Sequence, residues 1–144
     1  MPITDPTEQY FKDGTWGWDG SQWRKLPIVW GYSDRYAEYL STNDATAGNN
    51  YLTGTLVPVG EVWVVTNLLL LNVGSATVAT QGELYDGTTG FIVHRVSAPA
   101  SGAIIEWQGQ VYLKAGDRMR ATFYSCSLGD NLRATFLGYK MKVA

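Results

Sequence analysis

The chain has 144 residues, a length that fits one domain able to bury roughly 68% of its unfolded surface without a metal or a disulfide. Its 11 basic and 13 acidic residues give a formal net charge of -2. The basic residues are scattered apart from Arg118, Arg120 and Arg133, which argues against a nucleic-acid partner. Charged residues make up only 17% of the chain, whereas Trp, Tyr, Val, Thr and Gly are plentiful, and this composition predicts an all-β protein.

The single cysteine, Cys126, has no partner for an intramolecular disulfide, and its strand-like surroundings, ATFYSCSL, predict a packed thiol rather than a reactive one. No basic segment followed by an apolar one opens the sequence. The longest apolar run, VWVVTNLLLLNV, is interrupted by Thr66 and Asn67 and is shorter than a bilayer-spanning helix. We therefore expect a soluble protein without a Sec-type export signal and without membrane insertion.

The first part of the chain is rich in aromatic residues. Residues 1–9 contain two prolines and no periodicity, which indicates an extended arm. Asp19-Gly20-Ser21 then separates TWGW from QWRKL, as in the loop of a β-hairpin. A two-stranded hairpin is only marginally stable alone in water, so its faces are expected to rest on another surface.

Residues 33–40, SDRYAEYL, fit either a short helix capped by Ser33 or a strand, and we favour the strand because every later segment has strand character. Residues 41–50 form a polar stretch of turn-forming residues and predict a loop. Eight short strands separated by turns are predicted from Tyr51 onward: YLTGTLV, VWVVTNLLLLNV, QGELY, FIVHRV, AIIEWQ, QVYLK, RMRATFYSC and NLRATFLGYKMKV.

This succession of strands without an intervening amphipathic helix predicts a jelly-roll-like antiparallel β-sandwich. We place the arm and aromatic hairpin at residues 1–32 and the sandwich domain at residues 33–144. Gly60 and Gly116 each precede an acidic residue and a strand, where tight turns with positive φ are expected. In the last strand the apolar alternation shifts by one residue at Gly138, which predicts a β-bulge there.

The sequence lacks the usual catalytic patterns. His94 is the only histidine and has no second ligand at metal spacing, so no metal site and no cofactor are expected. No nucleophile elbow, P-loop or dinucleotide fingerprint occurs. The carboxylates that a glycosidase would need could come from Glu83, Asp86, Glu106 or Asp117, but turns or a solvated strand face explain each of them better. We expect a protein that is not an enzyme.

The candidate site therefore consists of the aromatic residues Trp16, Trp18, Trp23, Trp30 and Tyr32. A tryptophan buries roughly 150 to 250 Å², so these side chains need a covering surface. Three alternatives remain open: the hairpin covers its own sandwich, it contacts a neighbouring subunit, or its exposed rings stack on sugars. Trp63 and Trp107, which lie inside predicted strands, are expected in the core.

Four segments carry a resemblance to a known group: WGWDGSQWRKLP, VPVGEVWVVTNLLLLN, YLKAGDRMRATF and GDNLRATFLGYKMKV. From residue 14 onward the chain resembles the small β-sandwich structural proteins of tailed bacteriophage virions. The matching positions are Trp18, Asp19, Gly20, Trp23, Lys25 and Leu26; Val57, Pro58, Gly60, Val62, Trp63, Val64 and Val65; Leu113, Ala115, Gly116 and Asp117; and Gly138 and Tyr139.

The resemblance implies a non-enzymatic structural protein on the virion surface, assembled in the bacterial cytoplasm, that decorates a capsid or forms a head or tail fibre. It implies contacts with the major capsid or tail protein and a homo-oligomer, with a trimer favoured. The alternative is a carbohydrate-binding, receptor-recognition module of a tail fibre, which would bind a host-surface glycan.

Overall fold

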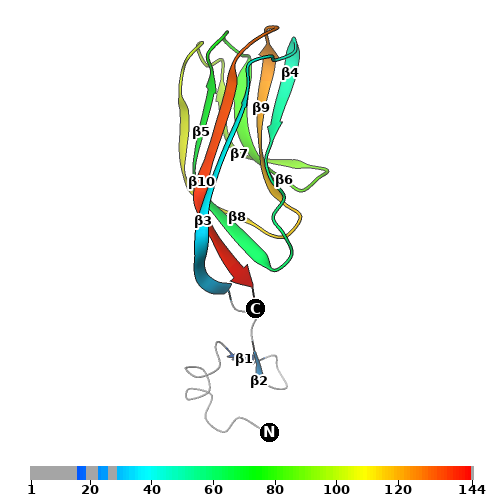
Figure 1. Ribbon diagram of the computed structural model, residues 1–144, viewed down its shortest axis with the longest axis vertical. Coiled ribbons are helices and arrows are strands. Elements are labelled where there is room, and N and C mark those ends of the chain that lie inside the picture. The colour runs from blue at the N-terminus through cyan, green and yellow to red at the C-terminus, as the bar shows by residue number, and fades with distance from the viewer. Residues whose placement is uncertain (1–15, 19–22, 26–28, 144) are drawn as a thin grey trace.

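The computed structural model describes residues 16–18, 23–25 and 29–143, with side chains described from Ser33 to Val143. This part of the chain is all β and contains no helix, as the composition predicted (Figure 1). Accordingly, no helix among these residues is long and apolar enough to span a bilayer.

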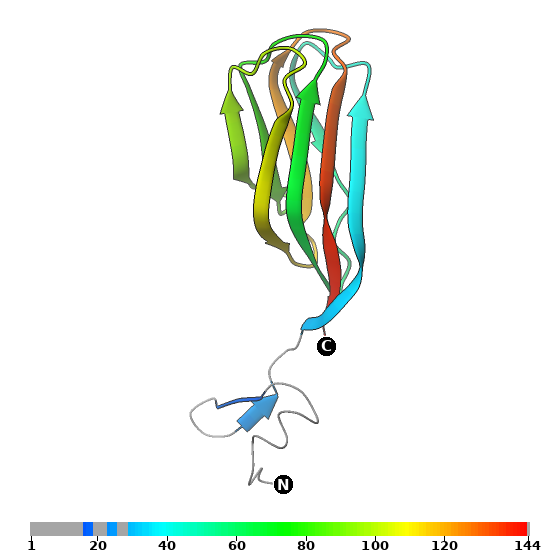
Figure 2. The same cartoon turned by 90° about the vertical axis from the view of Figure 1, so that its left-hand side faces the viewer.

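Two four-stranded antiparallel sheets form a β-sandwich. The first sheet has the order β3 (Val29–Thr42), β10 (Leu132–Val143), β5 (Glu61–Asn72) and β8 (Ile105–Leu113). The second sheet has the order β4 (Gly48–Thr53), β9 (Arg118–Cys126), β6 (Ala79–Tyr85) and β7 (Gly90–Ser97). Figure 2 shows the first sheet face on, with β3 at one edge and β8 at the other. The predicted jelly-roll-like sandwich is therefore confirmed.

The core lies between the sheets and follows the alternation of the strands. Leu68 and Leu70 of β5 and Phe136 of β10 are fully buried against Met119 and Phe123 of β9. Burying one such side chain stabilises the fold by about 1.5–3 kcal/mol. The predicted core tryptophan Trp63 is buried, Trp107 packs against the core while half-buried, and Cys126 is buried as expected.

Several predicted element boundaries were wrong. AIIEWQ and QVYLK form one strand, β8, because the ladder with β5 continues through a register shift between Val65 and Asn67. The predicted loop at 41–50 is shorter, since β3 extends to Thr42 and β4 begins at Gly48. The strand predicted from Tyr51 to Val57 already ends at Thr53.

The predicted irregularity at Gly138 is present, but the extra residue lies on the neighbouring strand. Leu137 pairs with Asn67 and Gly138 with Val65, so Thr66 of β5 is the inserted residue. A Cβ on Gly138 would overlap the carbonyl oxygen of Val64, so only glycine allows this close approach of the two backbones. The turn glycines Gly60 and Gly116 have the predicted positive φ, 86° and 90°.

The aromatic hairpin is confirmed as two short antiparallel strands, β1 (Trp16–Trp18) and β2 (Trp23–Lys25), in which Trp18 pairs with Trp23. Residues 33–40 form a strand, as predicted, within β3. This strand begins at Val29, whose partner in the ladder is Val143. The division into residues 1–32 and 33–144 stays a prediction.

Candidate functional site

The predicted site residues Trp16, Trp18, Trp23, Trp30 and Tyr32 occupy strand positions in β1, β2 and β3. Their side chains lie outside the described part of the structure. The site predicted from these aromatic residues therefore stays a prediction, and so do its three alternative coverings.

The structure brings together a different set of aromatic and charged residues on the outer face of the second sheet. In β9, RMRATFYSC alternates between the core residues Met119, Ala121 and Phe123 and outward positions. The outward positions carry Arg118, Arg120, Thr122 and Tyr124. Antiparallel pairing sets Arg120 opposite Glu83 and Thr122 opposite Gln81.

We call this surface the arginine–tyrosine face. It is built from outward residues of all four strands of the second sheet. Its members are Tyr51 of β4; Arg118, Arg120, Thr122 and Tyr124 of β9; Gln81, Glu83 and Tyr85 of β6; and Arg95 of β7.

Glu83 lies at the centre of this face and is only 2% exposed. Its carboxylate forms an ion pair with Arg120 and accepts hydrogen bonds from the Thr122 hydroxyl (3.0 Å) and the Gln81 amide (2.7 Å). The expectation of a turn or solvated strand face for Glu83 is therefore wrong. The carboxylate is buried because its cross-strand partners supply a charge and donors that replace water.

Tyrosine rings support the guanidinium groups of this face. Arg120 lies 3.8 Å from the ring centroid of Tyr85 and 5.0 Å from that of Tyr51. Arg118 lies 5.4 Å from the Tyr85 centroid, and Arg95 lies 5.4 Å from the Tyr124 centroid. These cation–π contacts hold the arginine side chains in defined positions.

The charges on this face do not balance. Glu83 is its only carboxylate and is paired with Arg120, so Arg95 and Arg118 have no carboxylate partner among the described residues. The Arg95 guanidinium donates a long hydrogen bond of 3.4 Å to Gln81. The Nε atom of Arg118 is buried and has no hydrogen-bond partner in the described part of the chain. Within the described residues, Arg95 and Arg118 therefore carry positive charge beside tyrosine rings without a carboxylate partner.

Sequence reasoning missed this face because it grouped Arg118, Arg120 and Arg133 only as an exception to scattered charge and did not place Arg118 and Arg120 on one face of a strand. The period-two spacing of Arg118, Arg120, Thr122 and Tyr124 was a usable signal, since alternate strand residues share a face. Tyr51 and Arg95 gave no such signal. Their strands join the same sheet only through the order β4, β9, β6, β7.

The other candidate carboxylates lie on an exposed strand face or in turns. Glu106 is exposed on the outer face of the first sheet, on the opposite side of the sandwich from Glu83. Asp86 accepts hydrogen bonds from the backbone N–H groups of Thr89 and Thr88, which lower its pKa, and Asp117 accepts one from Lys114 N. Both residues occupy turns, as expected.

His94 is half-buried in β7, as predicted. Burial raises the pKa of the Cys126 thiol, which fits packing rather than reactivity. Among the described residues, no group of three His, Cys, Asp or Glu side chains is arranged to hold a metal ion.

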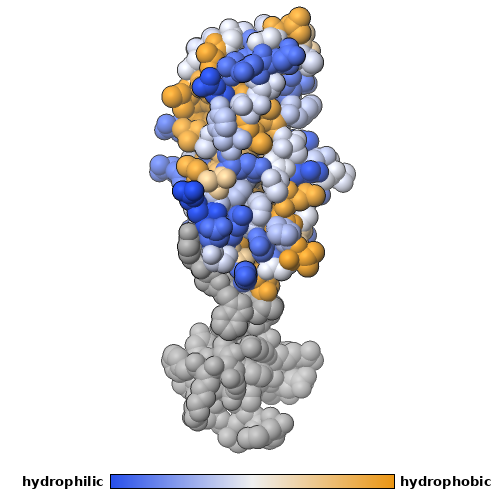
Figure 3. All heavy atoms as spheres, viewed as in Figure 1, coloured by the Kyte–Doolittle hydropathy of each residue, from blue (hydrophilic) through white to orange (hydrophobic). Residues whose placement is uncertain are grey.

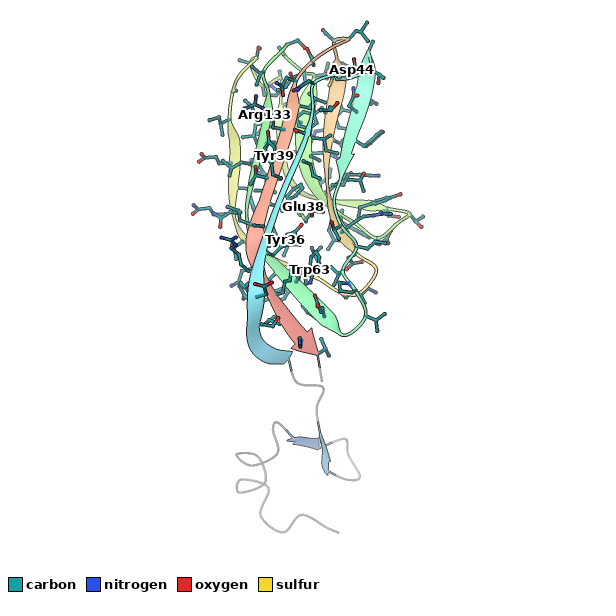
Figure 4. All side chains as sticks on the ribbon, in the orientation of Figure 1. Tyr36, Glu38, Tyr39, Asp44, Trp63 and Arg133 are labelled. Carbon is teal, nitrogen blue, oxygen red and sulfur yellow. The ribbon has the colours of Figure 1, made fainter. Side chains whose placement is uncertain are left out.

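A second polar cluster joins β3 to the connection between β4 and β5 (Figure 4). The Tyr36 hydroxyl donates to Glu38 at 2.7 Å, and Glu38 also accepts from the backbone N–H and hydroxyl of Thr55, both at 2.8 Å. Burial, together with Glu38, raises the pKa of Tyr36. The Tyr36 ring packs on Trp63 at 4.8 Å between centroids. With its acceptors and donors satisfied internally, this cluster stabilises the edge of the sandwich.

No family model and no curated protein matches the chain. Among solved structures, a chain of the acid-stable capsid structure of Helicobacter pylori bacteriophage KHP30 superposes with a TM-score of 0.57 at 15% identity. The alignment covers 83% of this chain and 95% of that chain. A pentameric capsid protein from metagenomic phage sequences is 20% identical over 99% of this chain and 77% of its own, but its TM-score of 0.35 does not establish a common fold. The sandwich is therefore a fold that this chain shares with a chain of a phage capsid.

Proposed function

We propose that the chain is a structural protein of a tailed-phage virion, either a capsid decoration protein or a head or tail fibre subunit. The observation that carries this proposal is the likeness to the KHP30 capsid structure, which extends over 95% of the chain aligned there. The similarity of the turn and strand motifs to small virion β-sandwich proteins supports it independently. In this role the protein acts through protein–protein contacts and is not an enzyme.

In the same proposal, residues 1–32 contribute attachment or subunit contact, and the sandwich is displayed at the virion surface. Its partners are the major capsid or tail protein and further copies of the same chain, with a trimer favoured. Aromatic and arginine side chains commonly anchor such interfaces, and the segment up to Tyr32 contains four of the six tryptophans.

Mass spectrometry and antibody labelling of purified particles of the source phage test the virion assignment. We expect the protein in intact particles, with label on their outer surface. Its presence in infected cells but not in purified particles would overturn the assignment. Label that appears only after the particles are opened would contradict the surface location.

Light scattering tests the subunit contact by comparing the full chain with a version that starts at Ile28. This start keeps Val29, the first residue of β3, in its ladder with Val143. A trimer that becomes a monomer on truncation would support contact through residues 1–27. A monomeric full chain would contradict the trimer, and an unchanged trimer would place the contact within residues 28–144.

The second candidate function is carbohydrate binding as a receptor-recognition module. The observation that favours it is the arginine–tyrosine face, where Arg95 lies beside Tyr124 and Arg118 beside Tyr85, neither paired with a carboxylate of the described residues. Stacking of sugars on the tryptophans of the N-terminal segment is the other form of this candidate. Quenching or a shift of tryptophan fluorescence during glycan titration tests that form, and its absence across a broad glycan array would count against it.

A further inference from the structure

We propose that the arginine–tyrosine face binds saccharides that carry carboxylate groups. In this assignment Arg95 and Arg118 pair with the carboxylates, while the exposed ring of Tyr51 packs on a sugar ring. The inference concerns the isolated protein and does not depend on its location in a virion, so the two can fail separately.

The charge distribution selects an anionic ligand. The whole chain has a formal net charge of -2, yet this face carries three arginines and one carboxylate. Glu83 is neutralised by Arg120 and shielded from water, so it cannot also neutralise Arg95 or Arg118. A guanidinium matches a carboxylate with two parallel hydrogen bonds, and such charge-assisted bonds are about twice as strong as neutral ones.

The Arg118 side chain gives a second reason to expect a ligand with hydrogen-bond acceptors. Its Nε atom is buried without a hydrogen-bond partner among the described residues. Leaving a buried donor unpaired costs about 1–3 kcal/mol, and more for a charged group. A ligand carboxylate reached by a change of the Arg118 rotamer would supply the acceptor that the described residues do not.

The tyrosines favour a saccharide over an acidic peptide. Tyr51 is 53% exposed, and the Arg120 guanidinium, which is fixed by Glu83, lies over its ring. A held aromatic ring offers a flat apolar surface for the C–H groups of a sugar ring at low entropic cost. Gln81 and Thr122, which lie between Tyr51 and Arg95 in the register of the sheet, are buried and hydrogen-bonded to Glu83, so the face presents mainly rings and guanidinium groups. A carboxylated sugar ring offers an apolar face and a charge within one unit, and so matches this composition.

Calorimetric titration of the full chain tests the proposal with an oligogalacturonide, its methyl ester and a glutamate octapeptide. An α2,8-linked oligosialic acid serves as a second acidic saccharide. We expect binding of at least one acidic saccharide, weakened by added salt. If the oligogalacturonide binds, its methyl ester should have an affinity lower by about 10-fold or more, because the ester cannot form the charge-assisted hydrogen bonds.

Variants locate the binding. Arg95→Gln and Tyr51→Ala change exposed members of the face, and Arg118→Lys keeps the charge while removing the paired geometry. Each should weaken binding of the acidic saccharide about 5- to 10-fold. The matched controls on the outer face of the first sheet are Arg133→Gln and Tyr39→Ala, which should leave it unchanged. Thermal unfolding checks that every variant is folded.

Four results would overturn the proposal. These are no binding of either acidic saccharide, equal binding of the methyl ester, binding of the octapeptide alone, and binding that Arg95→Gln and Tyr51→Ala leave unchanged. Binding of the octapeptide alone would instead indicate an acidic protein partner. These binding measurements keep their meaning even if the protein is not found in virions.

Discussion

The two sheets of the sandwich present different outer faces although their strands alternate in the same way. The outer face of the second sheet carries a linked set of charges, amides and rings around the buried Glu83. The outer face of the first sheet carries Leu69 and Leu71 of β5 with Leu137 of β10, flanked by exposed Tyr39 and Glu106. Among the described residues, the side chains on the outer face of the first sheet form no comparable network.

The difference shows that strand alternation assigns a face but not its chemistry. On the first sheet the outward residues are mainly separate apolar and polar side chains. Figure 3 views the sandwich from the edge that β3 and β4 form, and there too apolar and polar groups are interspersed. On the second sheet the cross-strand register brings complementary groups into contact, so their positions are mutually fixed. Side chains held in fixed positions are suited to recognising a ligand. In the first sheet, by contrast, the close fit of neighbouring backbones matters most.

The largest expected effect follows from that backbone fit. Gly138→Ala introduces a Cβ that overlaps the Val64 carbonyl oxygen, and the backbone cannot move without breaking the β5–β10 ladder. We expect a loss of more than about 3 kcal/mol in the free energy of unfolding, measured by urea denaturation. The neighbouring Leu137→Ala, at a 37% exposed position, should cost much less. Equal losses for both variants would contradict this account of the bulge.

Glu83→Gln tests the opposite face. It leaves the Arg120 side chain, 18% exposed, without its carboxylate partner, and breaking such a buried pair costs about 3 kcal/mol. The exposed Glu106→Gln on the first sheet is the matched control and should change stability by less than about 0.5 kcal/mol. Chemical denaturation of both variants measures the comparison. A small loss at Glu83 would mean that the network forms without holding the strands together.

The sequence allowed prediction of the fold because the signals for a sandwich are local. The strand RMRATFYSC and the turn glycines Gly60 and Gly116 were predicted from neighbouring residues alone, and the structure agrees with both. Strand pairing is not local. The single strand β8 was split in two because its register shift is visible only against β5.

The same distinction explains what was missed at the site. Glu83 resembles a solvated strand residue in QGELY, and only the pairing of β6 with β9 brings Arg120 and Thr122 to it. The arginine–tyrosine face also requires β4 and β7, which are distant in sequence. The tryptophan hypothesis rested on composition alone, which identifies residues that need a covering surface without specifying that surface.

Asp130 links the two sheets at the connections that cross between them. Its buried carboxylate accepts from Asn72 Nδ2 (2.9 Å), Ser75 Oγ (2.5 Å) and Ser127 N (2.9 Å). Although burial alone would raise it, these hydrogen bonds lower the pKa of Asp130 below its ordinary value. The unfolded chain therefore takes up the proton more readily than the folded one.

The stabilisation by Asp130 is therefore fully present above the ordinary aspartate pKa of about 3.9 and is lost as the pH falls through the lowered folded-state pKa. Asp130→Ala should lose about 1–3 kcal/mol at neutral pH and less in acid. Denaturation at neutral and acidic pH measures this, with the exposed Asp44→Ala as control. A loss that is the same at both pH values would contradict a role for the carboxylate charge.

The smallest expected effect concerns the edge where β3 meets the β4–β5 connection. Tyr36→Phe removes the hydroxyl that donates to Glu38, but Glu38 keeps both bonds from Thr55 and the ring keeps its packing on Trp63. We expect a loss of about 1 kcal/mol, the usual net value of one hydrogen bond. Tyr39→Phe, at a 60% exposed position of the same strand, should change stability hardly at all. If both substitutions were neutral, the packing of Tyr36 on Trp63 would stabilise this edge and the polar cluster would not. The hydrogen bonds of the cluster would then contribute as little to stability as the separate polar side chains on the outer face of the first sheet.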